Sequence, residues 1–388
     1  MNFELTAEEQ RIQTVAREFA EQEVAPISRE ADERGEFPAH LVPRMAELGL
    51  FAVPSTASAE DAMPNQRSHV GYALVCEELG RVDSSVRGFL TVHVGLVAGC
   101  IAEWGTEEQQ AAYSPKLTSG EWIGCYALTE PNAGSDVAGM EATARREGSE
   151  FVLNGEKIWI TNGTSARVAI VFASVDRSLR HKGICAFLVD TASQGLHREP
   201  MPGKELGHRA SEHVRIRLEE CRVGEDALLG AEGEGFKVAM SALDRGRLGV
   251  AAGALGVAQA CLEACVAYTK ERRQFGQRIA DFEMVQSVLA DMAADVEAAR
   301  LLVYKAAWLK DQGLPATKAT SIAKLFATEA AVRAASEAVL LHGNRGYSNE
   351  FPVERYYRDI KGLQIYEGTS HIQRIIIARE LVGRDRSG

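Results

Sequence analysis

The sequence lacks the short motifs that mark several common enzyme classes. It contains neither the His-Glu-x-x-His nor the paired Cys-x-x-Cys pattern of zinc sites, and no Gly-x-Ser-x-Gly turn of a nucleophilic serine. Two glycine-rich runs, GAEGEGF and GVAAGALG, follow no predicted strand, as a dinucleotide-binding loop must. We therefore predict no metal site and no doubly wound nucleotide fold.

Cysteine is sparse and is not arranged in pairs. The seven cysteines have neither the spacing of a disulfide framework nor that of a zinc site. They are Cys76, Cys100, Cys125, Cys185, Cys221, Cys261 and Cys265. We interpret all seven as structural.

Long apolar runs and excess positive charge are also missing. No apolar stretch approaches the length of a membrane-spanning helix, so we expect no integral membrane protein. The start, MNFELTAEEQRIQ, is acidic and amphipathic and resembles neither a signal nor a transit peptide, which favours a cytoplasmic protein. A processed organellar enzyme would look the same.

The net charge of −11 argues against nucleic acid as a partner, although a local basic pocket can still bind a small anion.

The composition that remains is that of a soluble globular protein, with 46% apolar and 25% charged residues over 388 positions. Three different patterns of apolar and polar residues follow one another along the chain. Residues 1–118 have helical periodicity, 119–227 have short apolar segments between turns, and 228–388 return to long helices. The pattern predicts a mainly α fold with a small central antiparallel sheet or barrel.

Local patterns predict individual elements. Thr6-Ala-Glu-Glu is a capping box at the start of a helix, and residues 54–68 form a polar loop. Asn154-Gly155 predicts a hairpin turn between two short strands. Later helices are predicted over residues 236–272, 282–312, 317–341 and 369–381.

One segment, Gln364-Ile-Tyr-Glu-Gly-Thr-Ser-His, is a candidate for chemistry. Glu367 lies in a tight loop, before a Thr369 or Ser370 that caps the next helix. The helix N-terminus would lower the pKa of this carboxyl, whereas an apolar pocket would raise it, and a base for a carbon acid needs the second effect to dominate. From the residues alone, a charge at the start of a helix is the simpler interpretation of Glu367.

A wider set of segments supports a more specific interpretation. The runs are CYALTEPNAGSD (125–136), LNGEKIWITNG (153–163), LDRGRLGVAAGALGVAQ (243–259), ERRQFGQ (271–277), EFPVERYYRD (350–359) and QIYEGTSHIQR (364–374). In their order and spacing they resemble the acyl-CoA dehydrogenase family over essentially the whole chain.

The resemblance implies an N-terminal helical domain, a middle β-barrel domain and a C-terminal four-helix-bundle domain. It also implies a homotetramer, or dimer of dimers, that contains FAD. The reaction would convert an acyl-CoA, or a carrier-bound acyl group, to its trans-2-enoyl thioester. Glu367 would remove the α-proton, the β-hydride would pass to flavin N5, and an electron-transfer flavoprotein would accept the electrons. Other branches hold the base at the position of Gly246, which leaves Glu367 as the candidate here.

Site residues are carried over by position. Those matching cofactor contacts are Tyr126, Leu128, Thr129, Ser135, Trp159, Ile160, Thr161, Arg272, Phe275 and Thr369. Among them, Arg272 matches an arginine that meets the FAD pyrophosphate of a neighbouring subunit. Those matching substrate contacts are Ser135, Asp244, Arg247 and Gly368.

The chain departs from the family pattern at several positions. Glu283 and Leu340 replace two glutamines on the FAD side, and the familiar Gly-Gly-Asn-Gly turn becomes His342-Gly-Asn-Arg345-Gly, which adds the charge of Arg345. Arg87 matches the arginine that glutaryl-CoA dehydrogenases direct at a distal carboxylate, although their accompanying glutamate is Gly80 here. A short acyl chain, a dicarboxylic acyl chain, a carrier-bound acyl group and a non-catalytic flavoprotein therefore remain alternatives.

Overall fold

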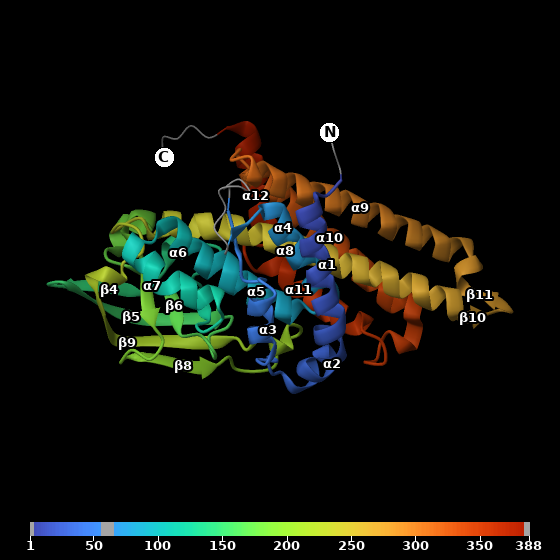
Figure 1. The fold of residues 1–388 in the computed structure, drawn as a ribbon, viewed down its shortest axis with the longest axis horizontal. Helices are drawn as coiled ribbons and strands as arrows, with labels where there is room; N and C mark the ends of the chain where they lie inside the picture. Colours follow the sequence, from blue (N-terminus) through green and yellow to red (C-terminus); the bar gives the residue numbers. More distant parts are fainter. Residues whose placement is uncertain (1–3, 56–65, 384–388) are drawn as a thin grey trace.

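The computed structural model describes residues 4–55 and 66–383. Along the chain, a helical part is followed by a β-sheet part and then by a second helical part (Figure 1). The predicted fold class is therefore confirmed.

The first part consists of helices. They are α1 (Ala7–Phe19), the π-helix η1 (Ala20–Val24), α2 (Ala25–Arg34), α3 (Leu41–Glu47), α4 (His69–Val82), α5 (Ser84–Leu90), the π-helix η2 (Thr91–Ala98), α6 (Gly99–Trp104) and α7 (Glu107–Thr118). The predicted capping box is present, because Thr6 Oγ1 accepts from Glu9 N at 3.2 Å and Glu9 Oε2 accepts from Thr6 N at 2.7 Å. Positions 56–65 of the predicted polar loop lie outside the described residues, and its flanks pair as β1 (Val53–Pro54) and β2 (Gln66–Arg67).

The middle part is a seven-stranded sheet. Its strands are β3 (Gly124–Ala127), β4 (Thr143–Glu147), β5 (Glu150–Ile160), β6 (Val168–Ser174), β7 (Ile184–Asp190), β8 (Leu196–Pro200) and β9 (Val214–Gly224). Their order is β3-β6-β4-β5-β9-β8, and β7 pairs with β6. The sheet is mixed rather than wholly antiparallel as predicted, because β6 pairs in parallel with both β3 and β4. Short 3-10 helices lie between strands at η3 (Val137–Gly139), η4 (Arg177–Gly183) and η5 (Arg209–Ser211), and η6 (Glu225–Ala227) follows β9.

The hairpin prediction at Asn154-Gly155 is wrong. Both residues lie inside the continuous strand β5, where its register against β9 shifts between Leu153 and Gly155. The Asn154 amide is engaged across the strands by Glu220, accepting from its backbone N–H at 2.8 Å. A side chain at Gly155 would collide with Ala142 at 2.7 Å. The asparagine-glycine pair therefore forms a β-bulge, whereas the β4–β5 turn lies at residues 148–149.

The last part contains the longest helices. They are α8 (Gly235–Glu271), α9 (Glu283–Asp311), α10 (Thr317–His342), α11 (Val353–Ile365) and α12 (Ser370–Val382). The short strands β10 (Arg273–Gln274) and β11 (Gln277–Arg278), with η7 (Ile279–Asp281), connect α8 to α9, and η8 (Gly343–Arg345) follows α10. Four of these helices were predicted nearly to their ends. Helix α11 was not predicted.

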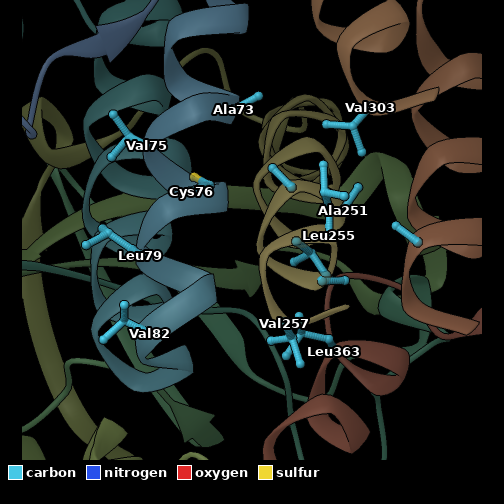
Figure 2. Close-up of a cluster of buried hydrophobic side chains, with 14 of the residues drawn as sticks. Ala73, Val75, Cys76, Leu79, Val82, Ala251, Leu255, Val257, Val303 and Leu363 are labelled. Carbon is cyan, nitrogen blue, oxygen red and sulfur yellow. The ribbon is translucent and has the colours of Figure 1, made fainter. Parts of the chain in front are cut away.

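Helix α8 lies at the centre of the molecule. Figure 2 shows apolar side chains of α4, such as Ala73 and Cys76, beside Ala251 and Leu255 of α8, with α9 on the other side of α8. The α4 and α8 backbones approach closely: a Cβ at Gly256 would lie 2.1 Å from the carbonyl oxygen of Glu77. Small residues at this crossing let the two helices pack at short range.

The expectation that no segment has membrane-spanning length is wrong. Among the described residues, Ser84–Trp104 and Gly235–Glu271 are long and apolar enough to cross a bilayer, by length and composition only. However, 89% and 67% of their most apolar windows are buried inside the protein. Both segments are core helices, and their apolar composition reflects burial on several sides.

Candidate active site

The loop between α11 and α12 carries Glu367 in a strained backbone conformation. Glu367 has a φ of 54° and Gly368 a φ of 92°, so two consecutive residues occupy the left-handed region. Thr369 then caps α12, accepting from Ile372 N at 3.2 Å. The wholly buried Gln373 donates to the Gly368 carbonyl at 2.9 Å. Strain of this kind is found at functional sites and persists only where the surroundings hold it.

The carboxylate of Glu367 lies directly against α8 at Gly246. A Cβ at position 246 would be 1.8 Å from Glu367 Oε2 and 3.0 Å from Oε1, so no larger residue fits beneath this carboxylate. Glu367 Oε2 is buried and has no hydrogen-bond partner within the described residues. An unpaired buried carboxylate oxygen is available to take a proton from a ligand.

The surroundings of Glu367 favour its protonated form. Burial raises its pKa from 4.5 to about 7, and the positive charges of Arg87, Lys324 and Arg247 oppose this increase in that order. The desolvation effect therefore dominates, as a base for a weak carbon acid requires. The helix N-terminus considered in the sequence does not prevent the rise.

Arg87 is buried beside the loop. Its guanidinium donates to the Tyr366 hydroxyl and, at 3.2 Å, to Thr91 Oγ1, while Nε has no partner within the described residues. Arg87 forms no ion pair with a carboxylate among the described residues, although the charge of Glu367 favours its protonated form. The sequence reached Arg87 only through the family resemblance, and the structure places it within electrostatic range of the candidate base.

The substrate-side positions Asp244 and Arg247 lie on α8 one turn apart. Asp244 forms an ion pair with Lys310 of α9 and a longer contact, 3.6 Å, with Arg247. Burial lowers the pKa of Arg247, and the charges of Asp244 and Glu367 oppose that decrease. These residues, with Gly368, are therefore near the candidate base.

Two predicted cofactor segments are adjacent in the sheet part. The backbone N–H of Ile158 donates to the carbonyl of Thr129 at 2.9 Å, which joins the segment 126–129 to the segment 159–161. Trp159 has a φ of 59° and is 49% exposed, which leaves its ring available to pack against a flat ligand. Thr161 is partly exposed. The side chains of the remaining three residues are buried in apolar clusters, so only their backbone can face a ligand: Tyr126, Leu128 and Ile160.

The residues present fit a flavin. A half-exposed tryptophan and two threonines on these adjacent segments suit an aromatic ring that also needs hydrogen bonds. The negative charge of Glu367 adds to the burial that raises the pKa of Tyr126, so these segments lie within electrostatic range of the candidate base. Ser135 is exposed in the loop after β3.

Two predicted cofactor residues lie far from the segments 126–129 and 159–161 within one chain. Arg272 and Phe275 lie at the α8–α9 connection, where β10 and β11 form the end of the molecule opposite β4 and β5 (Figure 1). Phe275 is 95% exposed and Arg272 is also exposed. The departures from the family pattern are exposed too: Glu283, Leu340 and Arg345.

Sequence reasoning missed three buried polar residues of the site. Lys324 donates to the loop at Gly368, Gln373 does the same, and Tyr72 has a buried hydroxyl without a partner in the described residues. The helical period could have indicated Lys324, because it falls on the face of α10 that buries Thr320, Ala327 and Ala331. Nothing local in the sequence distinguishes Tyr72 from an ordinary core tyrosine.

The fold and the site together define a three-part protein in which a strained loop holds a carboxylate, with one buried oxygen, against the central helix. The chain matches three family descriptions in order: "Acyl-CoA dehydrogenase, N-terminal domain" at residues 6–121, "Acyl-CoA dehydrogenase, middle domain" at 125–221 and "Acyl-CoA dehydrogenase, C-terminal domain" at 233–382. The chain therefore belongs to the acyl-CoA dehydrogenase family.

Individual relatives agree with this assignment. The chain is 43% identical over 384 residues to the mitochondrial short-chain specific acyl-CoA dehydrogenase of Homo sapiens, covering 99% of this chain and 92% of that one. It resembles the solved butyryl-CoA dehydrogenase of Megasphaera elsdenii with a TM-score of 0.94 and 38% identity, covering 98% and 100%. A solved structure described as the electron transferring flavoprotein of Acidaminococcus fermentans contains a chain with a TM-score of 0.95 and 40% identity, covering 99% and 100%.

Proposed function

We propose that this protein is an FAD-dependent acyl-CoA dehydrogenase that converts an acyl-CoA to its trans-2-enoyl thioester. The observation that carries the proposal is the Glu367 carboxylate, which has an unpaired buried oxygen and a raised pKa in the family's characteristic loop. In this proposal Glu367 is the catalytic base that takes the α-proton. Full-length relatives with the same activity in their names support the reaction class.

The chain's own residues perform the proton step and bind the reactants. Glu367 accepts the α-proton on the oxygen that faces no protein partner. Its backbone N–H donates to the thioester carbonyl, where negative charge develops, a contribution of roughly 3–4 kcal/mol for a well-placed donor. FAD, when bound, would supply the acceptor for the β-hydrogen as a hydride. Thr129, Trp159 and Thr161 would hold the flavin ring, and Ser135 and Thr369 would supply further contacts.

We also propose the partners and setting that this function needs. An electron-transfer flavoprotein accepts the electrons, in keeping with the solved relative described above. A homotetramer, or dimer of dimers, brings Arg272 and Phe275 of one subunit to the FAD of another. The protein works in the cytoplasm.

The test is anaerobic mixing of the purified holoenzyme with a graded panel of thioesters while flavin absorbance is followed. The panel contains butyryl- to octanoyl-CoA, branched and glutaryl esters, and one acyl-carrier protein. Loss of flavin absorbance with at least one CoA ester is expected in the wild type and in Glu380→Gln, an exposed control on α12 with the same charge change. Glu367→Gln is expected to lower the rate at least a hundredfold, because general-base catalysis is worth that much. Reduction at the wild-type rate in Glu367→Gln would contradict the assignment of the base, whereas reduction by the carrier protein alone would replace the CoA substrate.

A second candidate substrate is an acyl group with a distal carboxylate. It is favoured by Arg87, a buried guanidinium that has only neutral hydrogen-bond partners within the described residues and an unpaired Nε. A buried cation is more stable when an anion is next to it. Arg87→Met is then expected to reduce the preference for glutaryl-CoA over butyryl-CoA at least tenfold, and an unchanged preference would contradict this candidate.

A further inference from the structure

Lys324 is a charged residue in the interior of an alanine-rich helix. It lies in the middle of α10, its side chain is wholly buried, and Ala323 and Ala327 flank it on the same helix. Its Nζ donates to the carbonyl oxygen of Gly368 at 2.8 Å. It forms no ion pair within 4 Å of a carboxylate among residues 4–55 and 66–383. A buried ammonium with a single neutral partner carries a large desolvation cost unless a nearby anion offsets it.

The bond from Lys324 ends on the strained segment of the catalytic loop. Gly368 follows Glu367, and both residues have positive φ. The same carbonyl accepts from Gln373 of α12 at 2.9 Å, and Gln373 also reaches the Glu367 carbonyl at 3.4 Å. Donors from two helices, α10 and α12, therefore hold the peptide that orients the Glu367 carboxylate. Such donors can maintain a backbone conformation that is unfavourable on its own.

The charged groups around Lys324 come from each neighbouring element. Glu367 of the loop has the largest favourable charge effect on the ammonium, Arg247 of α8 opposes it, and Glu329 of α10 has a smaller favourable effect. Glu329 is already bound by neutral donors, Ser370 Oγ at 2.6 Å and Gln364 Nε2 at 3.0 Å. Burial lowers the pKa of Lys324 to about 7, and the charge of Glu367 counteracts that decrease. Reciprocally, the positive charge of Lys324 offsets part of the rise that burial causes in the pKa of Glu367.

We propose that Lys324 is a positioning residue for Glu367, whose ammonium fixes the Gly368 carbonyl and favours the ionised, proton-accepting form of the Glu367 carboxylate. The inference rests on the proposed role of Glu367 as the base. Lys324 touches neither reactant in this arrangement and acts through the loop. Its removal should therefore change the pH at which the base becomes active, whereas a residue that only fills space would change the rate equally at every pH.

The test separates proton abstraction from hydride transfer. Acetyl-CoA has α-hydrogens but no β-carbon, so the holoenzyme can exchange its α-hydrogens with deuterated water but cannot oxidise it. The exchange rate is measured by mass spectrometry across the pH range for the wild type, Lys324→Met, Lys324→Gln and Lys324→Arg. In the wild type the rate should rise with pH through the pKa of Glu367, because only the carboxylate accepts a proton.

The two neutral variants should move the midpoint of this rise upward by up to about one pH unit, the low end of the effect of a nearby opposite charge, because Lys324 itself loses charge near pH 7. Gln can still donate a hydrogen bond to Gly368, so a shift in both neutral variants assigns the effect to the charge. Lys324→Arg keeps a permanent positive charge and should leave the midpoint at or below the wild-type value. An upward shift in Lys324→Arg would overturn the proposal even if Lys324→Met does not fold.

Glu367→Gln distinguishes the two proposals. If Glu367→Gln lacks exchange and the neutral Lys324 variants keep the wild-type midpoint, the role of Lys324 is wrong but the base is supported. If Glu367→Gln exchanges at the wild-type rate, the base assignment fails and the role of Lys324 fails with it. Flavin absorbance of each purified variant verifies that the holoenzyme has formed.

Discussion

The carboxylate of Glu367 is ionised only against the influence of its surroundings. Burial raises its pKa to about 7, and three cations reduce that rise without removing it. In the unfolded chain this carboxyl loses its proton above about pH 4.5, whereas in the folded protein it keeps the proton up to about pH 7. The free energy of unfolding therefore falls as pH rises through this window and stays at the lower value above it.

The first prediction is that Glu367→Gln raises the free energy of unfolding above that of the wild type, and that this gain is larger at pH 8 than at pH 5. At pH 5 the wild-type side chain is mostly protonated and resembles the amide. At pH 8 the amide avoids the buried charge, and the gain in the free energy of unfolding should reach about 1–3 kcal/mol. Denaturant unfolding at both pH values measures the difference. The exposed Glu380→Gln should show no such pH dependence, and a gain in Glu367→Gln that is larger at pH 5 would contradict the sign.

A second prediction at the residue scale concerns Gly246. An alanine there would place its Cβ 1.8 Å from Glu367 Oε2, so the carboxylate must move from its present position. Gly246→Ala should therefore lower the rate of flavin reduction at least tenfold, since small displacements of catalytic groups have large effects on rate. The control is Gly88→Ala in α5, where the new Cβ meets only Ser211 Oγ at 3.9 Å. Equal rates for Gly246→Ala and the wild type would show that the carboxylate acts from another position.

At the scale of elements, the crossing of α4 and α8 depends on glycine. A Cβ at Gly256 would lie 2.1 Å from the Glu77 carbonyl oxygen, and a Cβ at Gly80 would lie 2.6 Å from the Gly253 carbonyl oxygen. Backbone atoms cannot move aside as a flexible side chain can. The two helices could accommodate larger residues only by separating.

The prediction at this scale is that Gly256→Ala destabilises the protein by about 2–4 kcal/mol, as overpacking in a core does at its upper range. The substitution raises helix propensity, so the expected loss is opposite in sign to the local effect of about 1 kcal/mol. Gly88→Ala again serves as the helical control and should be neutral or stabilising. Thermal unfolding monitored by circular dichroism measures both, and a stabilised Gly256→Ala would show that the crossing is looser than described.

The elements also show where local sequence patterns succeed. The capping box at Thr6 and the four long C-terminal helices follow from interactions within a few residues. The hairpin prediction failed because Asn154 and Gly155 are engaged by Glu220 and Ala142, which are distant in sequence. Helix α11 was missed although Val353, Tyr356, Ile360 and Leu363 recur at helical spacing and three of them are buried: Val353, Ile360 and Leu363.

At the scale of the whole molecule, the fold of one chain does not bring all the proposed cofactor residues together. Trp159 belongs to the sheet part, whereas Arg272 and Phe275 lie at the α8–α9 connection, at the far end of the helical part (Figure 1). If the proposed oligomer forms the FAD site, each site takes its tryptophan from one subunit and its arginine from another. The domain limits predicted from the sequence, 1–118, 119–227 and 228–388, also stay predictions.

The prediction at this scale is complementation between two defective variants. Trp159→Ala and Arg272→Met should each weaken FAD binding about tenfold or more, the size of a lost charge-assisted or stacking contact. Co-expression of the two variants should restore tight FAD binding at some sites, because a subunit with intact Trp159 can adjoin one with intact Arg272. Flavin fluorescence on dilution measures the tightly bound fraction. No restoration in a mixed oligomer would place both residues in the same subunit's site or Arg272 outside it.

The sequence by itself determined the fold class, the family and the loop that carries Glu367, because these depend on periodicity and on six ordered motifs. Tertiary structure alone decided the state of that carboxylate. Burial against Gly246 and the charges of Arg87, Lys324 and Arg247 come from three different helices, and a linear pattern cannot show their distances from Glu367. Tertiary structure also decided how the two segments of membrane-spanning length are interpreted, because their burial inside the protein accounts for their apolar composition.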